Sequence, residues 1–361
     1  MKKIDYRLIE SPQNNPYLNL AAETVMIDSP ANLCYFYLWT NAPTIVIGYN
    51  QNPFSECNLE AAANAGVFIA RRRTGGGAVY HDFGNLNFSF VMPEEIYDVK
   101  RQSSVIVNAL KSLGVNAELT GRNDITAGGR KFSGNAFYKG KTHRLHHGTL
   151  MIDVDFGALS SYLTPDPSKY LKKGVSSVKA RVVNLKELAP TITAKALKNA
   201  LRTAFCEEYG CFSALNCAVS AESESTAPTE NDFFKEEEVL SLAQKIGSDE
   251  YLYGKWRDFK CDKSADFSWG KVKAHVESSG GKVSKVVFST DGLFPSAVAF
   301  AEEYFSADNI ERDLTAAETA KSAAKSAPEP ATSKSKIQFP SDFTADDEKV
   351  FYDLKNLIEQ G

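Results

Sequence analysis

Short runs of apolar, β-branched and aromatic residues recur in the first part of the chain, and they favour strands over helices. Two of them, Leu33–Trp39 and Thr44–Gly48, are joined by a short segment containing Asn-Ala-Pro, which predicts a hairpin of well-buried strands. A third, Asn85–Phe90, alternates strictly between polar and apolar residues, as expected for a strand with one face on the core. Asn87 and Ser89 are then expected to face elsewhere, toward a cavity.

Two segments have helical periodicity. In Asp98–Leu113 apolar residues recur at helical spacing, and Gly114 follows as a stop signal. In Thr193–Tyr209 leucine and phenylalanine recur every four residues before Gly210. Because strands and helices do not alternate regularly, the expected fold class is α+β.

Shifts in composition predict two domains. Residues 219–232 include almost nothing apolar and predict a flexible loop. Residues 315–336 form a low-complexity segment that cannot build a core. We therefore expect a first domain at 1–247, ending in a helix at about 233–247, and a smaller second domain at 248–361.

The second domain is expected to be rich in strands. Tyr251–Trp256 and the alternating Lys285–Ser289 both have strand-like patterns. A final helix is expected at Ala345–Gln360.

Charge and cysteine content exclude several classes of function. The formal net charge is -4, which gives no general electrostatic reason to bind nucleic acid or an anionic membrane. No apolar run is long enough to span a bilayer, and the charged start of the chain does not resemble a signal peptide. The six cysteines have no metal-finger spacing, so we expect reduced thiols in a cytoplasmic protein.

A cationic and glycine-rich segment is the strongest candidate for ligand binding. Arg71–Arg73 runs into Gly75–Gly77, and guanidinium groups beside bare backbone N–H groups suit an anion. Taken alone, the arginines fit a solvated edge equally well. Three further polar, glycine-bearing segments adjoin strand-like sequence, at Gly121–Ile125, Gly128–Ala136 and His146–Leu150. Their number suggests that they line one cleft.

In order and spacing these segments resemble the lipoate–protein ligase A family. The motifs that carry the resemblance are Arg71–Asp82, Gly84–Phe88, Gly121–Asp124, Arg130–Gly134 and His147–Thr149, with support from Trp39–Gly48, Gln51–Phe54 and Ser176–Val182. The resemblance covers about residues 5–300. It implies a mixed-sheet catalytic domain of the biotin and lipoate ligase type, with a smaller α+β accessory domain at the C-terminal end.

The resemblance also implies an activity. Family members use ATP to convert lipoate to lipoyl-AMP and then pass the lipoyl group to a lysine of a lipoyl domain. The acceptors expected are E2 subunits of 2-oxoacid dehydrogenases or the glycine-cleavage H protein, with octanoate as a second candidate acyl group. Mg²⁺ is expected as a cofactor, and the protein is expected to be a monomer.

Roles for individual residues follow from matching the family motifs. The expected ATP-binding residues are Arg72, Gly77, Ala78, Val79, Tyr80, Asn123, Asp124 and Lys131. The expected lipoate-binding residues are Thr74, Gly75, Gly76, Lys131, His147 and Gly148. Lys131 is expected to be the catalytic residue, a cation that stabilises charge on the acyl carbonyl and the α-phosphate. Asp124 is also the expected Mg²⁺ ligand.

One departure from the family and two alternative functions remain. Where the best-known members carry two serines, this chain has Arg73 and Thr74, so the hydroxyl is kept and a charge is added. An octanoyl or lipoyl transferase that uses a carrier thioester would share the fold, although the cysteine-dependent kind needs an acyl-accepting thiol. A non-catalytic protein that binds lipoate or lipoyl domains is the other alternative.

Overall fold

The computed structural model describes residues 4–120, 124–163, 182–211, 236–254, 261–279, 282–306 and 337–359. Contacts divide the chain into two compact units. The first contains Met1–Gly48, Pro53–Thr74 and Ala78–Gly254, and the second contains Tyr49–Asn52, Gly75–Gly77 and Lys255–Gly361.

The main division between the units falls after Gly254, a few residues beyond the boundary expected after residue 247. The assignment of catalytic and accessory roles to the two parts stays a prediction. The segments expected to be flexible, 219–232 and 315–336, lie outside the described residues.

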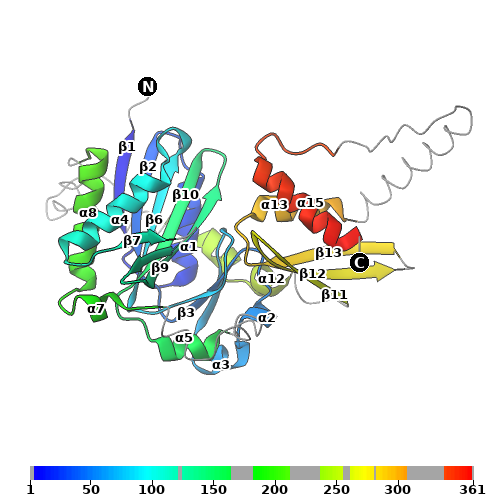
Figure 1. Cartoon of the computed structure of the whole chain (residues 1–361), viewed down its shortest axis with the longest axis horizontal. Coiled ribbons are helices and arrows are strands. Elements are labelled where there is room, and N and C mark those ends of the chain that lie inside the picture. Colours follow the sequence, from blue (N-terminus) through cyan, green and yellow to red (C-terminus); the bar gives the residue numbers. More distant parts are fainter. Residues whose placement is uncertain are drawn as a thin grey trace, which may run out of the picture. The chain divides into compact units, whose positions relative to one another are not determined.

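A mixed sheet forms the centre of the first unit (Figure 1). In the described part of the chain it has seven strands, which are, in spatial order, β1 (Asp5–Glu10), β2 (Leu33–Trp39), β6 (Asn85–Pro93), β10 (His143–Met151), β9 (Arg130–Lys139), β8 (Asp124–Ala127) and β7 (Glu118–Thr120). β1 and β2 are parallel, and all other neighbours are antiparallel. The expected α+β class with a mixed sheet is confirmed.

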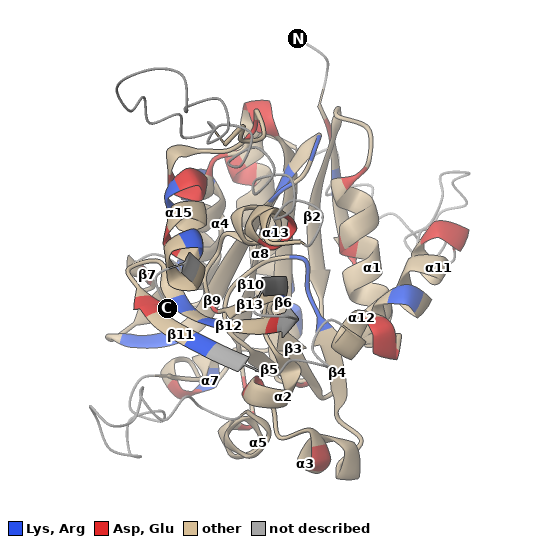
Figure 2. Ribbon diagram, turned by 90° about the vertical axis from the view of Figure 1, so that its right-hand side faces the viewer, with Lys and Arg blue, Asp and Glu red and all other residues tan. Residues whose placement is uncertain are grey.

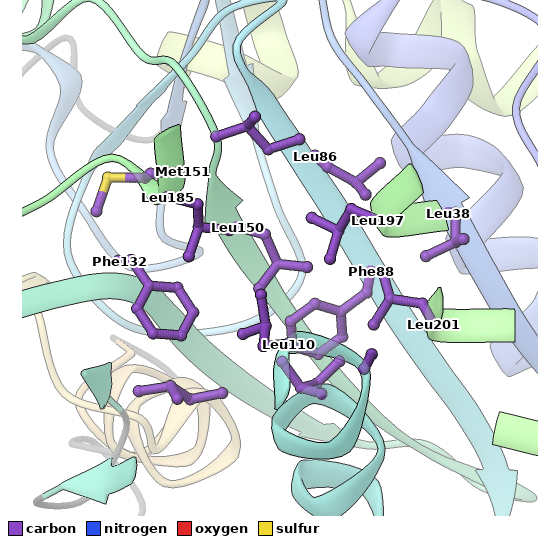
Figure 3. Close-up of a cluster of buried hydrophobic side chains, with 14 of the residues drawn as sticks. Leu38, Leu86, Phe88, Leu110, Phe132, Leu150, Met151, Leu185, Leu197 and Leu201 are labelled. Carbon is purple, nitrogen blue, oxygen red and sulfur yellow. The ribbon is translucent and has the colours of Figure 1, made fainter. Parts of the chain in front are cut away.

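Helices cover both faces of this sheet. On one face, α4 (Val99–Ser112) and α8 (Ala194–Tyr209) pack on the strands. Figure 3 shows the leucines of these helices beside Phe88 of β6. On the other face lie α1 (Pro16–Ile27) and α11 (Glu237–Ile246), whose apolar side chains meet Tyr35, Tyr37 and Trp39 of β2.

Local signals set the ends of these helices as expected. The Asp98 carboxylate caps α4 by accepting hydrogen bonds from backbone N–H groups of the first turn. The Thr193 hydroxyl caps α8, and Gly210 ends it in the left-handed conformation, with φ of 67°. Both predicted helices are confirmed. Figure 2 shows acidic residues at the start of α11 and a lysine near its end, the charge order that the helix dipole favours.

The predicted hairpin of Leu33–Trp39 and Thr44–Gly48 is wrong, although both strands exist. β3 (Thr44–Ile47) leaves the large sheet and joins a second one, parallel to β4 (Phe68–Arg71) and antiparallel to β5 (Val79–His81). The chain changes sheet at Asn41, whose buried side chain accepts a hydrogen bond from Asn19 of α1 at 2.9 Å. A side chain anchored in this way holds the connection away from a hairpin turn.

Short helices connect the larger elements of the first unit. They are α2 (Pro53–Glu56), α3 (Leu59–Asn64), a 3₁₀ turn (Glu94–Ile96), α5 (Phe156–Tyr162), α7 (Leu185–Leu188) and α12 (Asp249–Tyr253). The last of these corrects the strand expected from Tyr251 onward. Ser248 caps α12 by accepting from the Tyr251 N–H group, and two acidic residues occupy its first turn. Trp256 lies outside the described residues.

The second unit contains a small antiparallel sheet. Its described strands follow the order β11 (Cys261–Phe267), β12 (Gly270–Ser279) and β13 (Lys282–Thr290). α13 (Pro295–Tyr304) and α15 (Ala345–Glu359) cover one face with a separate apolar core. The predicted strand at Lys285–Ser289 and the predicted final helix are therefore confirmed.

None of the helices in the described part of the chain combines the length and the apolar character needed to cross a membrane.

Candidate active site

Lys131 and Asp124 form an ion pair across two neighbouring strands of the large sheet. Lys131 lies on β9 and Asp124 on β8, and Nζ lies 2.7 Å from Oδ1. The side chains are 38% and 43% exposed, respectively. The backbone of Lys131 is fixed on its other side, where its carbonyl accepts from the Val183 N–H group at 2.9 Å. The pair is therefore held in place by backbone and remains open to a ligand.

Gly134 leaves the space that the Lys131 side chain occupies. A Cβ at Gly134 would lie 3.1 Å from Nζ and 3.3 Å from Cε of Lys131. The Gly134 N–H group donates to Thr149 Oγ1 at 3.1 Å. Thr149 and His147 are two residues apart on β10, so their side chains lie on the same face of the sheet. The Lys131 ammonium, which lies beside Gly134 and Thr149, is therefore on the face that carries His147.

Arg72 is buried beside this face. Its Nε donates to Thr74 Oγ1 at 2.9 Å, and its Nη1 donates to the Val46 carbonyl at 3.0 Å. Burial lowers the pKa of Arg72 to about 10, partly countered by Glu23. Arg72 therefore remains a cation at neutral pH, held by the second sheet and by Thr74.

A buried chain of hydrogen bonds leads from Arg72 to Glu23. Thr74 Oγ1 lies 2.9 Å from His147 Nε2, and His147 Nδ1 lies 2.9 Å from Glu23 Oε1. Because Thr74 accepts from Arg72, its hydroxyl hydrogen can serve His147 Nε2, which leaves Nδ1–H to donate to the carboxylate. Every group in the chain then has its partner.

Glu23 also accepts a hydrogen bond from Ser89 of β6. Trp39 Nε1 donates to Ser89 Oγ at 2.9 Å, and Ser89 Oγ donates to Glu23 Oε1 at 2.5 Å. Ser89 thus faces α1 and this polar network, which agrees with its expected direction away from the core of β6. Sequence reasoning missed Glu23, a single glutamate of α1 that no motif marks.

The remaining nucleotide-binding candidates are placed as follows. Ala78 precedes β5, and Val79 and Tyr80 lie on β5, beside β3. Burial raises the pKa of Tyr80 to about 12, with nearby acidic groups adding to the shift. Asn123 lies outside the described residues.

Gly148 lies on β10 where a side chain would not fit. A Cβ there would lie 2.6 Å from both Asn135 Oδ1 and Phe88 Cζ. Glycine at this position therefore allows Asn135 and Phe88 to pack closely against β10, on the face opposite His147.

Gly75, Gly76 and Gly77 group with the second compact unit. There the Gly76 N–H group donates to the Gly292 carbonyl at 3.2 Å, and Gly76 has a φ of 93°. A Cβ at Gly75 would lie 2.3 Å from the same carbonyl oxygen. Glycine is thus required at Gly75 for close backbone approach and at Gly76 for its positive φ.

The three consecutive arginines have three different surroundings. Arg71 is buried and donates to the Leu252 carbonyl at 2.6 Å, at the end of α12. Arg73 lies over the Tyr138 ring and also donates to Asp28 Oδ2 at 3.2 Å. Arg72 alone joins the chain that leads to His147. A uniformly solvated arginine run is therefore excluded.

A family model described as the lipoyl protein ligase A/B catalytic domain matches residues 15–206. The chain belongs to this family. It is therefore a ligase-family enzyme, as the motifs indicated. The lipoate–protein ligase A of Psychrobacter cryohalolentis is 36% identical to it over 293 residues, which span 80% of this chain and 84% of that protein.

Solved structures of lipoate ligases resemble this ligase as well. P. falciparum LipL1 in complex with lipoate superimposes with a TM-score of 0.70 and 30% identity, over 83% of this chain and 89% of that one. A bipartite lipoate protein ligase from Thermoplasma acidophilum, described with its E2 lipoyl domain, has a TM-score of 0.57 and 26% identity, over 72% and 99% of the two chains. A lipoate–protein ligase A bound with ATP has a TM-score of 0.53 and 26% identity, over 70% and 98%.

Proposed function

We propose that this ligase converts lipoate and ATP to lipoyl-AMP and diphosphate, and then transfers the lipoyl group to a lysine of a lipoyl domain. The observation that carries the proposal is the partly exposed Lys131 side chain on the sheet face that also bears the buried chain from Arg72 to Glu23. Related structures bound with lipoate and with ATP support both substrates. The archaeal relative described with its E2 lipoyl domain supports the acceptor.

In the first half-reaction a lipoate carboxylate oxygen attacks the α-phosphorus of ATP, and the bond to the diphosphate leaving group breaks. Two anions must approach each other, so the protein has to supply positive charge and fixed geometry. Lys131 would contact the acyl carbonyl oxygen and the α-phosphate, and Arg72 would contact the nucleotide. The stretch Gly77–Tyr80 would hold the nucleotide by its backbone.

In the second half-reaction the acceptor lysine amine attacks the acyl carbonyl carbon, and the bond to AMP breaks. Negative charge develops on the carbonyl oxygen in the transition state, where the Lys131 ammonium would stabilise it. AMP leaves with the electrons of the broken bond, and the amine loses a proton to solvent. Lys131 therefore acts through its charge in both steps, without a covalent intermediate.

The donor set near Lys131 suits a magnesium ion that arrives with ATP. Mg²⁺ bound with phosphates prefers one or two carboxylates and keeps several waters. The Asp124 side chain is 43% exposed and its Oδ1 lies 2.7 Å from the Lys131 Nζ, so it would hold the ion next to the phosphate that Lys131 would contact. When bound, Mg²⁺ would neutralise charge on the phosphate oxygens.

The acyl group would lie beside Thr74 and His147, on the face of β10 opposite the packing contacts of Gly148. Octanoate shares the carboxylate and the apolar chain of lipoate, so it is a candidate second substrate. E2 subunits and the glycine-cleavage H protein are the proposed acceptors. We expect the protein to act as a monomer.

The described cysteines do not favour a cysteine-dependent transferase. Cys34, Cys57, Cys206 and Cys211 are buried, and burial raises the pKa of Cys57 to about 12. A nucleophilic thiol needs a lowered pKa and access to substrate. All four thiols are buried, and burial raises the pKa of Cys34, Cys57 and Cys211.

The proposal is tested by the intact mass of an apo lipoyl domain after incubation with enzyme, lipoate, Mg²⁺ and ATP. We expect a gain of one lipoyl group that disappears when ATP is omitted. Transfer from an acyl-carrier thioester without ATP would instead support the transferase. Lipoate binding with no transfer under either condition would support the non-catalytic binding protein.

A further inference from the structure

His81, at the end of β5, is a buried histidine to which the proposed reaction gives no role. It is 3% exposed and lies against the ring of Trp39, with a centroid distance of 6.0 Å. Its Nδ1 lies 3.2 Å from Asn41 Nδ2. Its Nε2 has no hydrogen-bond partner among the described residues. Since buried polar atoms are rarely left unpaired, Nε2 is a candidate ligand contact.

A chain of amides fixes which nitrogen of His81 carries the proton. Asn19 Nδ2 donates to the backbone carbonyl of Thr40 at 3.2 Å, and a carbonyl can only accept, so the Asn19 amide orientation is determined. The same Nδ2 donates to Asn41 Oδ1 at 2.9 Å. The other side of the Asn41 amide is therefore its NH₂ group, which faces His81 Nδ1.

His81 Nδ1 must accept this hydrogen bond. In a neutral imidazole one nitrogen accepts and the other carries the hydrogen, so His81 has its proton on Nε2. Asn19 and Asn41 are both fully buried, and the Asn19 oxygen is itself fixed by the Tyr37 hydroxyl, which donates to it at 3.0 Å. The tautomer is thus determined by a chain that begins at a backbone carbonyl.

The charged surroundings also keep His81 neutral. Burial, the Arg72 guanidinium and His147 together lower the pKa of His81 to about 3. The result is a neutral N–H donor beside a buried cation. A guanidinium and an N–H group can only donate, so the missing partner is an acceptor. In an acyl chain with a dithiolane, the strong acceptors are the two carboxyl oxygens.

We propose that Asn41 is a positioning residue that fixes the Nε2–H tautomer of His81, so that His81 donates a hydrogen bond to a carboxyl oxygen of the acyl substrate. This inference rests on the proposed function for the identity of the substrate. The tautomer is independent of it, because it is set by Asn19 and Asn41 in the ligand-free protein.

The tautomer is measured by ¹⁵N NMR of histidine-labelled protein without substrate. The chain has five histidines, and the spectrum of a His81→Gln variant identifies the His81 signals. We expect an unprotonated Nδ1 and a protonated Nε2. In Asn41→Asp the carboxylate can only accept, so Nδ1 should become protonated. A protonated Nδ1 in the unmodified protein, or no change in Asn41→Asp, would overturn the positioning role.

Asn14→Asp is the matched control. Asn14 is exposed, and its Nδ2 donates to the same Thr40 carbonyl at 2.9 Å. The substitution adds the same charge and removes a hydrogen bond to the same loop without touching His81. The His81 signals should therefore remain those of the unmodified protein.

The donor role is measured by calorimetric titration with lipoate, without ATP or acceptor. His81→Leu removes the donor and should weaken binding about 10- to 100-fold, the usual loss for a hydrogen bond to a charged group. His81→Gln keeps an N–H group and should restore most of the affinity. A shift of the Nε2 signal on lipoate addition tests the same contact in the unmodified protein. Unchanged affinity in His81→Leu, or an unshifted Nε2 signal, would overturn the donor role.

The two proposals fail in different ways. If lipoate does not bind the unmodified protein, the proposed function fails together with the donor role, while the tautomer result still stands. If lipoate binds, but His81→Leu keeps the same affinity or the Nε2 signal does not shift, only the donor role fails.

Discussion

Lys131 Nζ lies 2.7 Å from Asp124 Oδ1, and more than a third of each side chain is exposed. Exposed ion pairs contribute only about 0–1 kcal/mol to stability, because water and salt screen them. The pair therefore adds little to the fold. Its value lies in keeping a cation and a carboxylate together on adjacent strands, where ATP and its metal ion would bring charges of both signs.

Asp124→Asn should separate the effect on catalysis from the effect on stability. The amide keeps the shape but loses the charge that would hold Mg²⁺, so the Mg²⁺ concentration needed for half-maximal rate should rise about 10-fold or more. The free energy of unfolding should change by less than about 1 kcal/mol. Rates over a Mg²⁺ titration and urea unfolding check the two effects. An unchanged Mg²⁺ requirement would contradict the role given to Asp124.

Gly134→Ala should displace the Lys131 ammonium. The new Cβ would lie 3.1 Å from Nζ, and the flexible lysine can move aside, so the fold should tolerate the change. A small displacement of a catalytic group has a large effect on rate, so we expect kcat to fall about 10-fold or more while KM for ATP stays within about 3-fold. Steady-state kinetics measure both. Equal losses in binding and turnover would point to general damage instead.

Glu23→Ala should destabilise the first unit. The change leaves the His147 and Ser89 donors buried without their acceptor, and each such loss costs about 1–3 kcal/mol. Glu23→Gln keeps an acceptor oxygen and should recover much of that stability. Urea unfolding compares them with Glu207→Ala, an exposed position of α8, which should change stability by less than about 0.5 kcal/mol. Equal stability of all three variants would mean that the network is not structural.

Stability should fall as the pH drops below 6.5. Burial lowers the pKa of His81 and of His146 to about 3 from 6.5. Between pH 6.5 and pH 3 these histidines bind protons in the unfolded chain but not in the folded chain. The free energy of unfolding therefore decreases as the pH falls from 6.5 toward 3. Each histidine contributes a slope of about 1.4 kcal/mol per pH unit. The free energy of unfolding, measured with urea from pH 6 to pH 4.5, should fall less steeply with pH in His81→Gln than in the unmodified protein. An identical slope in the two proteins would contradict the buried neutral state of His81.

Elements set by local signals were predictable from the sequence. α4 and α8 have their caps, periodic leucines and terminal glycines within one segment each, so the pattern alone fixes them. α12 shows the limit of pattern reading. Its aromatic residues are typical of a strand, but the Ser248 cap and the acidic first turn stabilise a helix.

Pairing between distant segments was not predictable in the same way. Leu33–Trp39 and Thr44–Ile47 are correct strands, but their partners are set by packing against segments far along the chain. Glu23 was missed for the same reason, since 124 residues separate it from His147 in the sequence. The motif residues Arg72, Thr74 and His147 were found because they match a family pattern, and the structure brings them into one hydrogen-bonded chain.

The central claim is that the charge of Lys131 drives transfer of the acyl group. Lys186 offers a matched control. It is an exposed lysine of the same unit, and its Nζ lies 2.6 Å from Asp153 Oδ2. Thermal unfolding should show that Lys131→Ala and Lys186→Ala both remain folded.

The deciding measurement is the rate of lipoylation of an apo lipoyl domain, followed by intact mass with saturating ATP, Mg²⁺ and lipoate. Lys131→Ala should lose about 100-fold or more, the usual cost of removing a group that stabilises transition-state charge. Lys186→Ala should keep the unmodified rate within about 2-fold. A Lys131→Ala variant that transfers lipoate at a near-normal rate would contradict the proposed mechanism.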